Sequence, residues 1–485
     1  MAFILPALLL TPFISGLCCH FFKNWKTQYA ITISVSVLHL ALSAAMFAGL
    51  VVPAEIPMLG YDAMSKLFLL ILSNTYFWIV LVSYFYIKLP VESSSSGGKR
   101  HYFMLMNFYL AANSAAVLSN HFGMYWVAVE MTTLSVVPLI YYSRSDESLI
   151  AMWKYLFFVS IGIAFAFIGI LFLALSAKGT SLEGVQLYFS EYKKGASLLS
   201  PVWLKASFIF IFAGLSTKIG IAPMHSGDVD ATSTAPSPIA ALFSGTLRIT
   251  ALIGVLRIFQ ILKLTDSYEF ARTLLIVGGL FSIFLTMVFM LRATDMKKMV
   301  AYSSVEHLGI IVLGIATGGL AFIGAIYHII FNSMTKVGLF LSAGKIHYKY
   351  KSKNINEISG VIERLPWSGW LFFISFLAVS AIPPFGFFFS EIKIFEGILF
   401  SDKPYILFIM MFMIFMIFLG MGNSFFKMLY RKNETQDFSS NDESFDVFHF
   451  ATIALLLIMV AIAVAAPNLL SENIQDIAKD FGALP

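Results

Sequence analysis

Long apolar stretches recur from one end of the 485-residue chain to the other. A helix needs about 20 consecutive apolar residues to cross the hydrocarbon core of a bilayer. Short polar segments separate these stretches, and the short alternating segments typical of barrel strands are missing. The pattern predicts an all-α polytopic membrane protein with about fourteen transmembrane helices. We expect them at residues 2–22, 29–52, 62–89, 102–118, 124–142, 150–177, 202–225, 239–262, 274–291, 300–317, 320–346, 370–400, 405–429 and 450–466.

Two of the predicted helices are interrupted by proline. Helix 7 breaks at Pro223, shortly after Lys218, and helix 12 breaks at Pro383 and Pro384, shortly before Glu391. The two helices lie five places apart in the order, and this odd offset gives them opposite orientations in the membrane. Paired interruptions of this kind indicate an inverted repeat with a binding site near the bilayer midplane.

The chain is divided accordingly into four parts. Residues 1–100 hold helices 1–3, and a polar linker at 91–100 containing SSSSGG reads as a flexible loop. We assign helices 4–8 to a first repeat (101–262), helices 9–13 to a second, inverted repeat (263–430), and the C-terminal loop with helix 14 to 431–485.

Composition supports a membrane class and argues against a redox centre. Hydrophobic residues make up 59% of the chain and charged residues 12%, with a mean hydropathy of +0.83. The two cysteines, Cys18 and Cys19, are adjacent, which excludes a multi-cysteine metal cluster. Flavin and dinucleotide fingerprints are also missing. We therefore expect no cofactor, no metal and no catalytic residue on this chain, and no nucleic-acid partner.

The loop charges predict an orientation. Lysine and arginine gather in the loops on one side, for example between Lys345 and Lys353, and this side is expected to be cytoplasmic. Both termini then lie on the non-cytoplasmic side of the cell's inner (plasma) membrane.

Buried charge marks the first candidate site. Lys218 in helix 7 and Glu130 in the middle of helix 5 are both expensive to place in lipid unless paired or solvated. We expect the two to pair and the lysine to exchange a proton as its partner moves. A static ion pair that holds helices together is the alternative. His225, just beyond the break, extends this group.

Further titratable residues follow in the second half. His328, Asn332 and Lys336 share one face of helix 11 and suggest a proton relay, with a hydrogen-bonded packing stripe as the alternative. Glu391 is a relay candidate, whereas Lys393 is expected to turn toward a neighbouring helix or the interface.

Other charged residues remain secondary candidates. Glu306 and His307 lie in the first two turns of helix 10, where interfacial solvation is as good an explanation as function. Arg248 in helix 8 can bias neighbouring groups but cannot shuttle protons. Asp62 and Lys66 are spaced as a structural helix pair, and the run 153–155 (WKY) is predicted to anchor helix 6 at the interface.

Several of these stretches, taken together, resemble the antiporter-like membrane subunits of respiratory complex I and its relatives. WVAVEMTTLS resembles the family's glutamate helix and LSTKIGIAPMH its lysine helix; AYSSVEHLGII, HIIFNSMTK and PPFGFFFSE follow in the family's order. The resemblance spans about residues 62–428, and within the family it is nearest to component F of hydrogenase-4 and formate hydrogenlyase.

The resemblance implies proton pumping or cation/proton exchange, driven by redox chemistry on other subunits. It implies Glu130 and Lys218 as the first pair, His328 and Lys336 as a central axis, and Glu391 as the terminal site. The chain departs from the family where HSGDVDA replaces the usual HTWLPDA, and where Ile249 and Asn332 replace a frequent lysine and a second histidine.

We therefore expect a proton-translocating membrane subunit that works with other membrane subunits and a peripheral redox or soluble module. Two alternatives remain open. The first is a subunit of a multi-subunit Na⁺/H⁺ antiporter or of an inorganic-carbon uptake complex. The second is a structural scaffold that has lost transport.

Overall fold

The computed structural model describes residues 4–51, 56–88, 96–184, 186–431 and 443–483. Within these ranges the regular secondary structure is helical, and β-pairing is limited to isolated bridges. The helices of the first half are α1 (Ile4–Phe21), α2 (Trp25–Phe47), α3 (Ala63–Lys88), α4 (Ser96–Val117), α5 (Phe122–Ile140), α6 (Asp146–Ser176), α7 (Phe189–Lys194), α8 (Pro201–Ile219), α9 (Ser226–Thr234), α10 (Ser237–Leu242) and α11 (Arg248–Leu262). Those of the second half are α12 (Tyr268–Met290), α13 (Met296–Thr317), α14 (Gly319–Tyr350), α15 (Val361–Arg364), α16 (Pro366–Val379), α17 (Gly386–Leu399), α18 (Tyr405–Tyr430), α19 (Val447–Leu469) and α20 (Ser471–Asp480).

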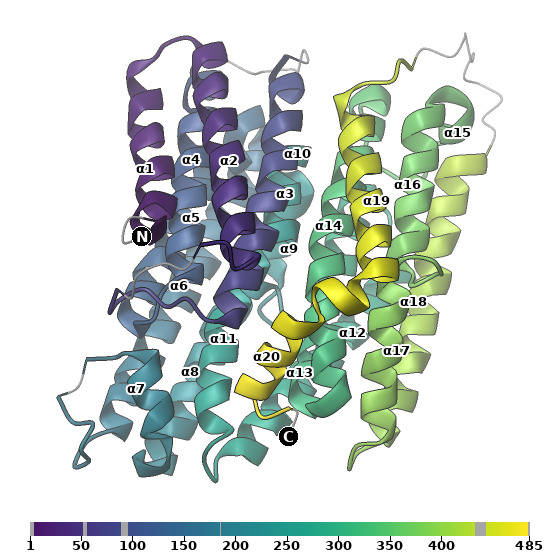
Figure 1. Cartoon of the computed structure of the whole chain (residues 1–485). Helices are drawn as coiled ribbons and strands as arrows, with labels where there is room; N and C mark the ends of the chain where they lie inside the picture. Colours follow the sequence, from purple (N-terminus) through teal and green to yellow (C-terminus); the bar gives the residue numbers. More distant parts are fainter. Residues whose placement is uncertain (1–3, 52–55, 89–95, 185, 432–442, 484–485) are drawn as a thin grey trace.

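The helices form an upright bundle that runs from α1 at one side to α18 at the other (Figure 1). In the described part of the chain, 12 helical segments are long and apolar enough to cross a membrane. The prediction of an all-α, multi-span membrane protein is confirmed. Helix α4 and the α16–α17 pair would bring the number to the predicted fourteen, but that count and the inverted repeat stay predictions.

The centre of the bundle is formed by the helices that carry most of the candidate residues. In the most apolar windows of Ser237–Leu262, Met296–Thr317 and Gly319–Tyr350, the buried share of residues is 100%, 94% and 83%. The corresponding share is only 33% for α1 and 28% for α2, which lie at the edge of the bundle. A helix that is buried all round can hold charged side chains away from lipid, provided that they find partners.

Both predicted breaks are present, and each begins with a residue in the left-handed region. Helix α8 ends at Gly220 (φ 87°), and a cis Ala222–Pro223 bond follows. Helix α16 ends before Ala381 (φ 53°), and a cis Pro383–Pro384 bond follows. Helix 7, predicted to continue to residue 225, therefore ends earlier, because Gly220 adopts a conformation that suits glycine and stops the helix.

Some local predictions need correction. Residues 96–100 belong to α4 rather than to a loop, while 91–95 lie outside the described residues. The C-terminal segment contains an unforeseen short helix, α20, which contacts α3 and α14. It lies obliquely across the lower front of the bundle (Figure 1). Its end is held by a hydrogen bond from Gln260 Nε2 to the Asp480 carbonyl, 2.8 Å long.

The expected pair of Asp62 with Lys66 is also wrong. Asp62 caps the start of α3 and forms an ion pair with Arg257 of α11, which donates in addition to Ser65 at 3.0 Å. Lys66 instead lies 4.9 Å above the centre of the Tyr61 ring. A guanidinium that reaches two acceptors in a fixed fork outcompetes a flexible ammonium for this carboxylate.

Helices α6 and α8 approach each other closely through small residues. A Cβ atom added to Gly214 would lie 2.4 Å from the Gly162 carbonyl oxygen and 2.6 Å from the Ala166 nitrogen. One added to Gly169 would lie 2.8 Å from the nitrogen of Ile211. Small residues let helix backbones touch in a membrane, where packing rather than hydrophobicity drives helix association.

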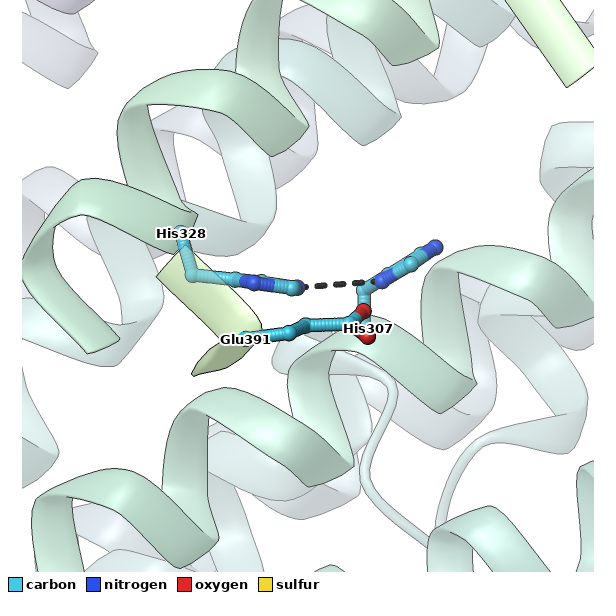
Figure 2. A group of neighbouring side chains, drawn as sticks. All are labelled: His307, His328 and Glu391. Atoms are coloured by element: carbon cyan, nitrogen blue, oxygen red, sulfur yellow. Dashed lines mark hydrogen bonds between the residues drawn. The ribbon is translucent and has the colours of Figure 1, made fainter. Parts of the chain in front are cut away.

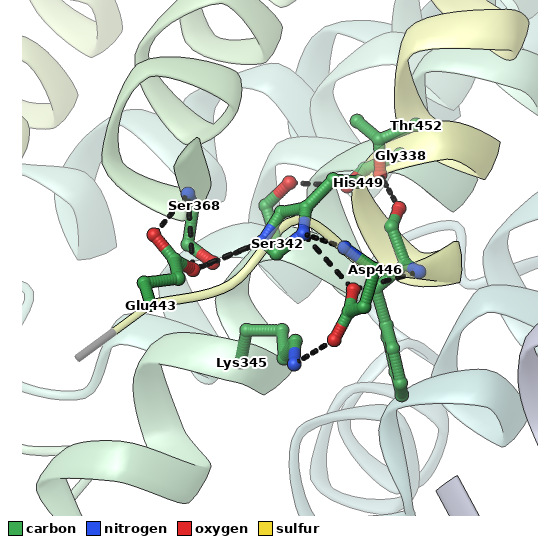
Figure 3. A network of polar contacts seen from close by, with 9 residues as sticks. Gly338, Ser342, Lys345, Ser368, Glu443, Asp446, His449 and Thr452 are labelled. Carbon is green, nitrogen blue, oxygen red and sulfur yellow. Dashed lines mark hydrogen bonds and ion pairs between the residues drawn. The ribbon is translucent and has the colours of Figure 1, made fainter. Parts of the chain in front are cut away.

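A polar network joins α14, α16 and the start of α19 at one end of the bundle (Figure 3). Glu443 accepts hydrogen bonds from the Ser368 backbone nitrogen, at 3.1 Å, and from His449 Nε2, at 2.9 Å. Asp446 pairs with Lys345 and with His449 Nδ1, the latter at 2.9 Å. Each carboxylate therefore contacts at least two donors, which offsets the cost of its partial burial.

This network predicts an acid-sensitive component of stability. Burial alone would raise the pKa of the Asp446 carboxyl, but its contacts with His449 and Lys345 outweigh burial and hold the pKa at about 2. A depressed carboxyl pKa contributes stability at neutral pH, here about 2 kcal/mol. This contribution is lost as pH falls from about 4 toward about 2.

We expect Asp446→Asn to lower the melting temperature of the detergent-purified protein at neutral pH. The variant should also show a smaller decrease of the melting temperature between about pH 4 and pH 2 than the wild type. Thermal unfolding followed across this pH range measures both effects. Asp476→Asn, a change of an exposed aspartate in α20, is the matched control. Identical pH profiles for the Asp446 variant and the wild type would contradict the prediction.

Candidate functional site

Lys218 lies in the last turn of α8 and is enclosed by oxygen atoms of α5. Its ammonium donates to the Val129 carbonyl, to Thr132 Oγ1 at 2.5 Å and to Thr133 Oγ1 at 2.8 Å. The side chain is buried, with 1% of its surface exposed. An ammonium has three donors, and this cage of neutral oxygens satisfies all of them.

Glu130 belongs to the same turn of α5 but does not contact the lysine directly. One carboxylate oxygen accepts from Ser160 Oγ of α6 at 3.5 Å, and no ion pair joins Glu130 to Lys218 in the described structure. The carboxylate nevertheless lies close enough to interact electrostatically with the ammonium. The two residues are therefore electrostatic partners without a direct contact, because hydroxyl and carbonyl oxygens surround the ammonium.

The break after α8 brings a buried ion pair to the centre. Asp228 of α9 lies 2.5 Å from the Arg248 guanidinium at the start of α11, with 0% and 1% of the two side chains exposed. Arg248 also donates to Thr232 Oγ1 at 3.2 Å. The π-helical segment Phe243–Leu247 immediately precedes the arginine. π-Helical insertions re-aim side chains and are frequent at functional sites.

Asp228 was not among the candidates, although HSGDVDA places a carboxylate beside the broken helix. Tyr155 was also missed: it was predicted to be interfacial, but it is fully buried. Its hydroxyl interacts electrostatically with Glu130, Asp228 and Arg248, and it has no hydrogen-bond partner among the described residues. Tyr155 thus lies near both the first glutamate and the central ion pair.

His225 lies at the edge of this group and interacts electrostatically with Arg248. Its ring packs edge-on to Tyr302, with centroids 5.6 Å apart. The neighbouring Asp230 forms ion pairs with Lys154, at 3.3 Å, and Lys298, at 2.9 Å. These partners are partly exposed, so this region contacts solvent more readily than Arg248 does.

Lys336 connects the two halves. Its ammonium donates to Ser303 Oγ of α13 at 2.6 Å and is fully buried. It interacts electrostatically with Glu306 and Arg248. Asn332, one turn earlier on α14, is also buried, and its Oδ1 has no partner among the described residues.

Two histidines and two glutamates lie close to one another beyond Lys336. His307 Nδ1 lies 3.0 Å from His328 Nε2, and His328 Nδ1 lies 3.0 Å from Ser390 Oγ. Glu391 of α17 adds a carboxylate beside the two imidazoles (Figure 2). Glu306 and His307 are 6% and 1% exposed, so the interfacial explanation is wrong for both. Helix α13 begins earlier than predicted, at Met296, and its flanking helices cover this turn.

Glu306 and Glu391 line the same cavity, of about 290 Å³, between the second break and α18. Lys393 lies apart from it, in a cavity of about 630 Å³ that Tyr327 and Gln475 also line. The structure therefore brings together Lys336, Glu306, His307, His328 and Glu391, and leaves Lys393 outside this group, as expected.

Comparison with known proteins identifies relatives of this chain. Residues 119–420 match the family described as NADH:quinone oxidoreductase/Mrp antiporter, transmembrane. A hydrogenase-4 component F homolog of Methylacidiphilum infernorum is 33% identical over 348 residues, which cover 71% of this chain and 73% of the relative.

Two solved structures share the fold. A chain of the archaeal membrane-bound sulfane sulfur reductase, a respiratory membrane complex, superposes with a TM-score of 0.84 at 17% identity, over 99% of this chain and 97% of that one. A chain of the Mrp complex from Dietzia sp. DQ12-45-1b superposes with the same TM-score at 16% identity, again over 99% and 97%. At these identities the likeness concerns the fold alone.

Proposed function

Because the chain belongs to the NADH:quinone oxidoreductase/Mrp antiporter membrane family, we propose that it is a proton-translocating subunit of a larger membrane complex. The observation that carries the proposal is the series of buried titratable groups through the central helices. The series begins at the half-buried Glu130. Its buried members are Lys218, Tyr155, Asp228, Arg248, Lys336, Glu306, His307, His328 and Glu391. Ionisable groups inside a membrane bundle mark ion pathways by default.

The groups at the two ends of the series have different tasks in this proposal. Glu130, half-buried and near Lys218, takes up a proton, and the lysine releases or accepts one as the field of the carboxylate changes. Arg248 keeps its proton and sets the field at Lys336. His328 and Glu391 pass the proton toward the cavity beside α18.

The proposal includes partners and a location. Proton movement against a gradient needs a source of energy, and the expected source is redox chemistry on other subunits and a peripheral module. We place the complex in the plasma membrane, with both termini on the non-cytoplasmic side, as the loop charges predict. Two inverted five-helix repeats remain part of this proposal.

A second candidate function is Na⁺/H⁺ exchange, and the family description, which names the Mrp antiporter beside NADH:quinone oxidoreductase, favours it. Purification of the tagged protein in mild detergent, followed by mass spectrometry, separates the two. Redox subunits among the co-purifying proteins support the redox-driven pump, and small antiporter subunits support exchange. A partner that belongs to neither class would direct the search to inorganic-carbon uptake.

Glu391→Gln in the purified, reconstituted complex tests the relay. We expect proton translocation to fall by about 100-fold, because an amide cannot exchange the proton that the carboxyl passes on. A pH-sensitive dye inside the liposomes measures the flux. Glu396→Gln, an exposed glutamate on the same helix, is the matched control and should retain full flux. Equal flux in both variants would exclude Glu391 from the path.

A further inference from the structure

Three metal-ligating side chains converge from three helices near the second break. His307 comes from α13, His328 from α14 and Glu391 from α17, and one ligand atom of each lies within 4.8 Å of the others. All three side chains are buried, with 1%, 0% and 6% exposed. In Figure 2 the two imidazoles meet edge to edge and the carboxylate reaches toward His307.

The donor set fits one class of ion. Two imidazole nitrogens and one carboxylate oxygen are the ligands of catalytic-type zinc sites, with the fourth position left for water. Metal–nitrogen distances of about 2.0–2.1 Å in a tetrahedral site place the two nitrogens about 3.3 Å apart. His307 Nδ1 and His328 Nε2 are 3.0 Å apart, so a shift of a few tenths of an ångström suffices. Na⁺ and Mg²⁺ prefer oxygen ligands and fit this set poorly.

Hydrogen bonds behind His328 prepare it as a ligand. Ser390 Oγ donates to the Phe387 carbonyl at 2.9 Å, so its contact with His328 Nδ1 is one in which the hydroxyl accepts. Nδ1 therefore carries the hydrogen, and Nε2 accepts from His307 Nδ1. His307 can bind an ion through Nδ1 once its hydrogen moves to Nε2, which has no partner among the described residues. Such second-shell bonds fix the tautomer and orientation of metal-binding histidines.

The carboxylate ligand faces an open cavity. Glu391 lines the cavity of about 290 Å³ beside α18, which Glu306 also lines. This cavity gives an ion a way to the Glu391 carboxylate.

We propose that His307, His328 and Glu391 bind a divalent transition-metal ion, with Zn²⁺ the best fit, and that the bound ion stops proton transfer. The ion takes the lone pair of His328 Nε2 and the carboxylate oxygen of Glu391, so neither atom can receive a proton. The binding stands on the geometry alone, while the arrest of transfer rests on the proposed function.

Binding is measured first, on the detergent-purified chain, with Zn²⁺ in a calorimeter and with Co²⁺ by its visible absorption. We expect one ion per chain and the intense bands of tetrahedral Co²⁺. His307→Ala and Glu391→Gln should weaken binding by at least tenfold, and Ser390→Ala, which keeps every ligand, by about 10- to 100-fold. His347→Ala, a histidine farther along α14, should bind like the wild type.

Stoichiometric binding that survives His307→Ala and Glu391→Gln, or no binding to the wild type, would overturn the site. Monodisperse elution of each variant shows that a loss of binding is not a loss of fold. The Ser390→Ala variant adds a change too small to unfold the bundle.

Proton flux is measured separately, in reconstituted complex with and without Zn²⁺. We expect Zn²⁺ to stop flux in the wild type at the concentration at which it binds, and a chelator to restore it. Binding that leaves flux unchanged would overturn the arrest. A complex with no flux even in chelator would count against the proposed function and would leave the binding result standing.

Discussion

Replacing Lys218 with methionine is expected to stop proton transport in the assembled complex while leaving the fold intact. Methionine fills nearly the same volume but has no proton to exchange, so flux should fall by about 100-fold or more. The three oxygen atoms around the ammonium do not become stranded. Thr132 Oγ1 already donates to the Val129 carbonyl at 2.7 Å, and a hydroxyl of α5 can rotate toward its own helix.

Lys218→Arg separates charge from proton exchange. Arginine keeps a positive charge at the site but does not release its proton, so it too should abolish transport. Lys205→Met, on the same helix and beside the Phe270 ring, is the control for loss of a lysine. Proton flux with the pH-sensitive dye, together with the subunit composition of each purified complex, gives the result. Full flux in the methionine variant would remove Lys218 from the mechanism.

Arg248→Met is expected to give the largest loss of stability of any single change. It leaves Asp228 with 0% of its side chain exposed and without its cation, and breaking a buried pair from one side costs about 3–5 kcal/mol. The double change Arg248→Met with Asp228→Leu removes both charges and should recover most of this loss, since apolar replacements of buried pairs are often close to neutral.

Thermal unfolding of the four proteins in detergent completes a double-mutant cycle. Arg257→Met is a less damaging comparison, because Asp62 is 33% exposed and can be solvated. If the single and double variants at 228 and 248 lost the same stability, the ion pair would have no special role in the fold.

Much of the fold could be predicted from the sequence because the bilayer imposes a simple rule. Apolar stretches of spanning length must be helices, and prolines near Lys218 and Glu391 must interrupt them. The short helix α20 was not predicted because its 10 residues are too few and too polar to cross a membrane. Its position depends on contacts with α3 and α14, which no local pattern records.

The site was only partly predictable, for a different reason. An ionisable residue in an apolar run is costly and can therefore be recognised in the sequence, as for Lys218, His328 and Glu391. The threonines that enclose Lys218 look like any membrane-helix hydroxyls, and only the fold brings α5 against the end of α8. Asp228 lay in a stretch that reads as a polar connection, and its partner Arg248 is 20 residues away in another helix.

The close contact between α6 and α8 limits which parts can move during a transport cycle. The close backbone contact of Gly214 with Gly162 opposes sliding or rotation of α8, and Lys218 lies one turn beyond this contact. The backbone of Lys218 is therefore held in place by the packing of α8 against α6. In the proposed mechanism, Lys218 therefore changes partners by moving its own side chain between the three oxygen atoms of α5 and Glu130, rather than by a shift of the helix. This movement of the Lys218 side chain takes place on the time scale of side-chain motion, and it requires no opening or closing of a domain.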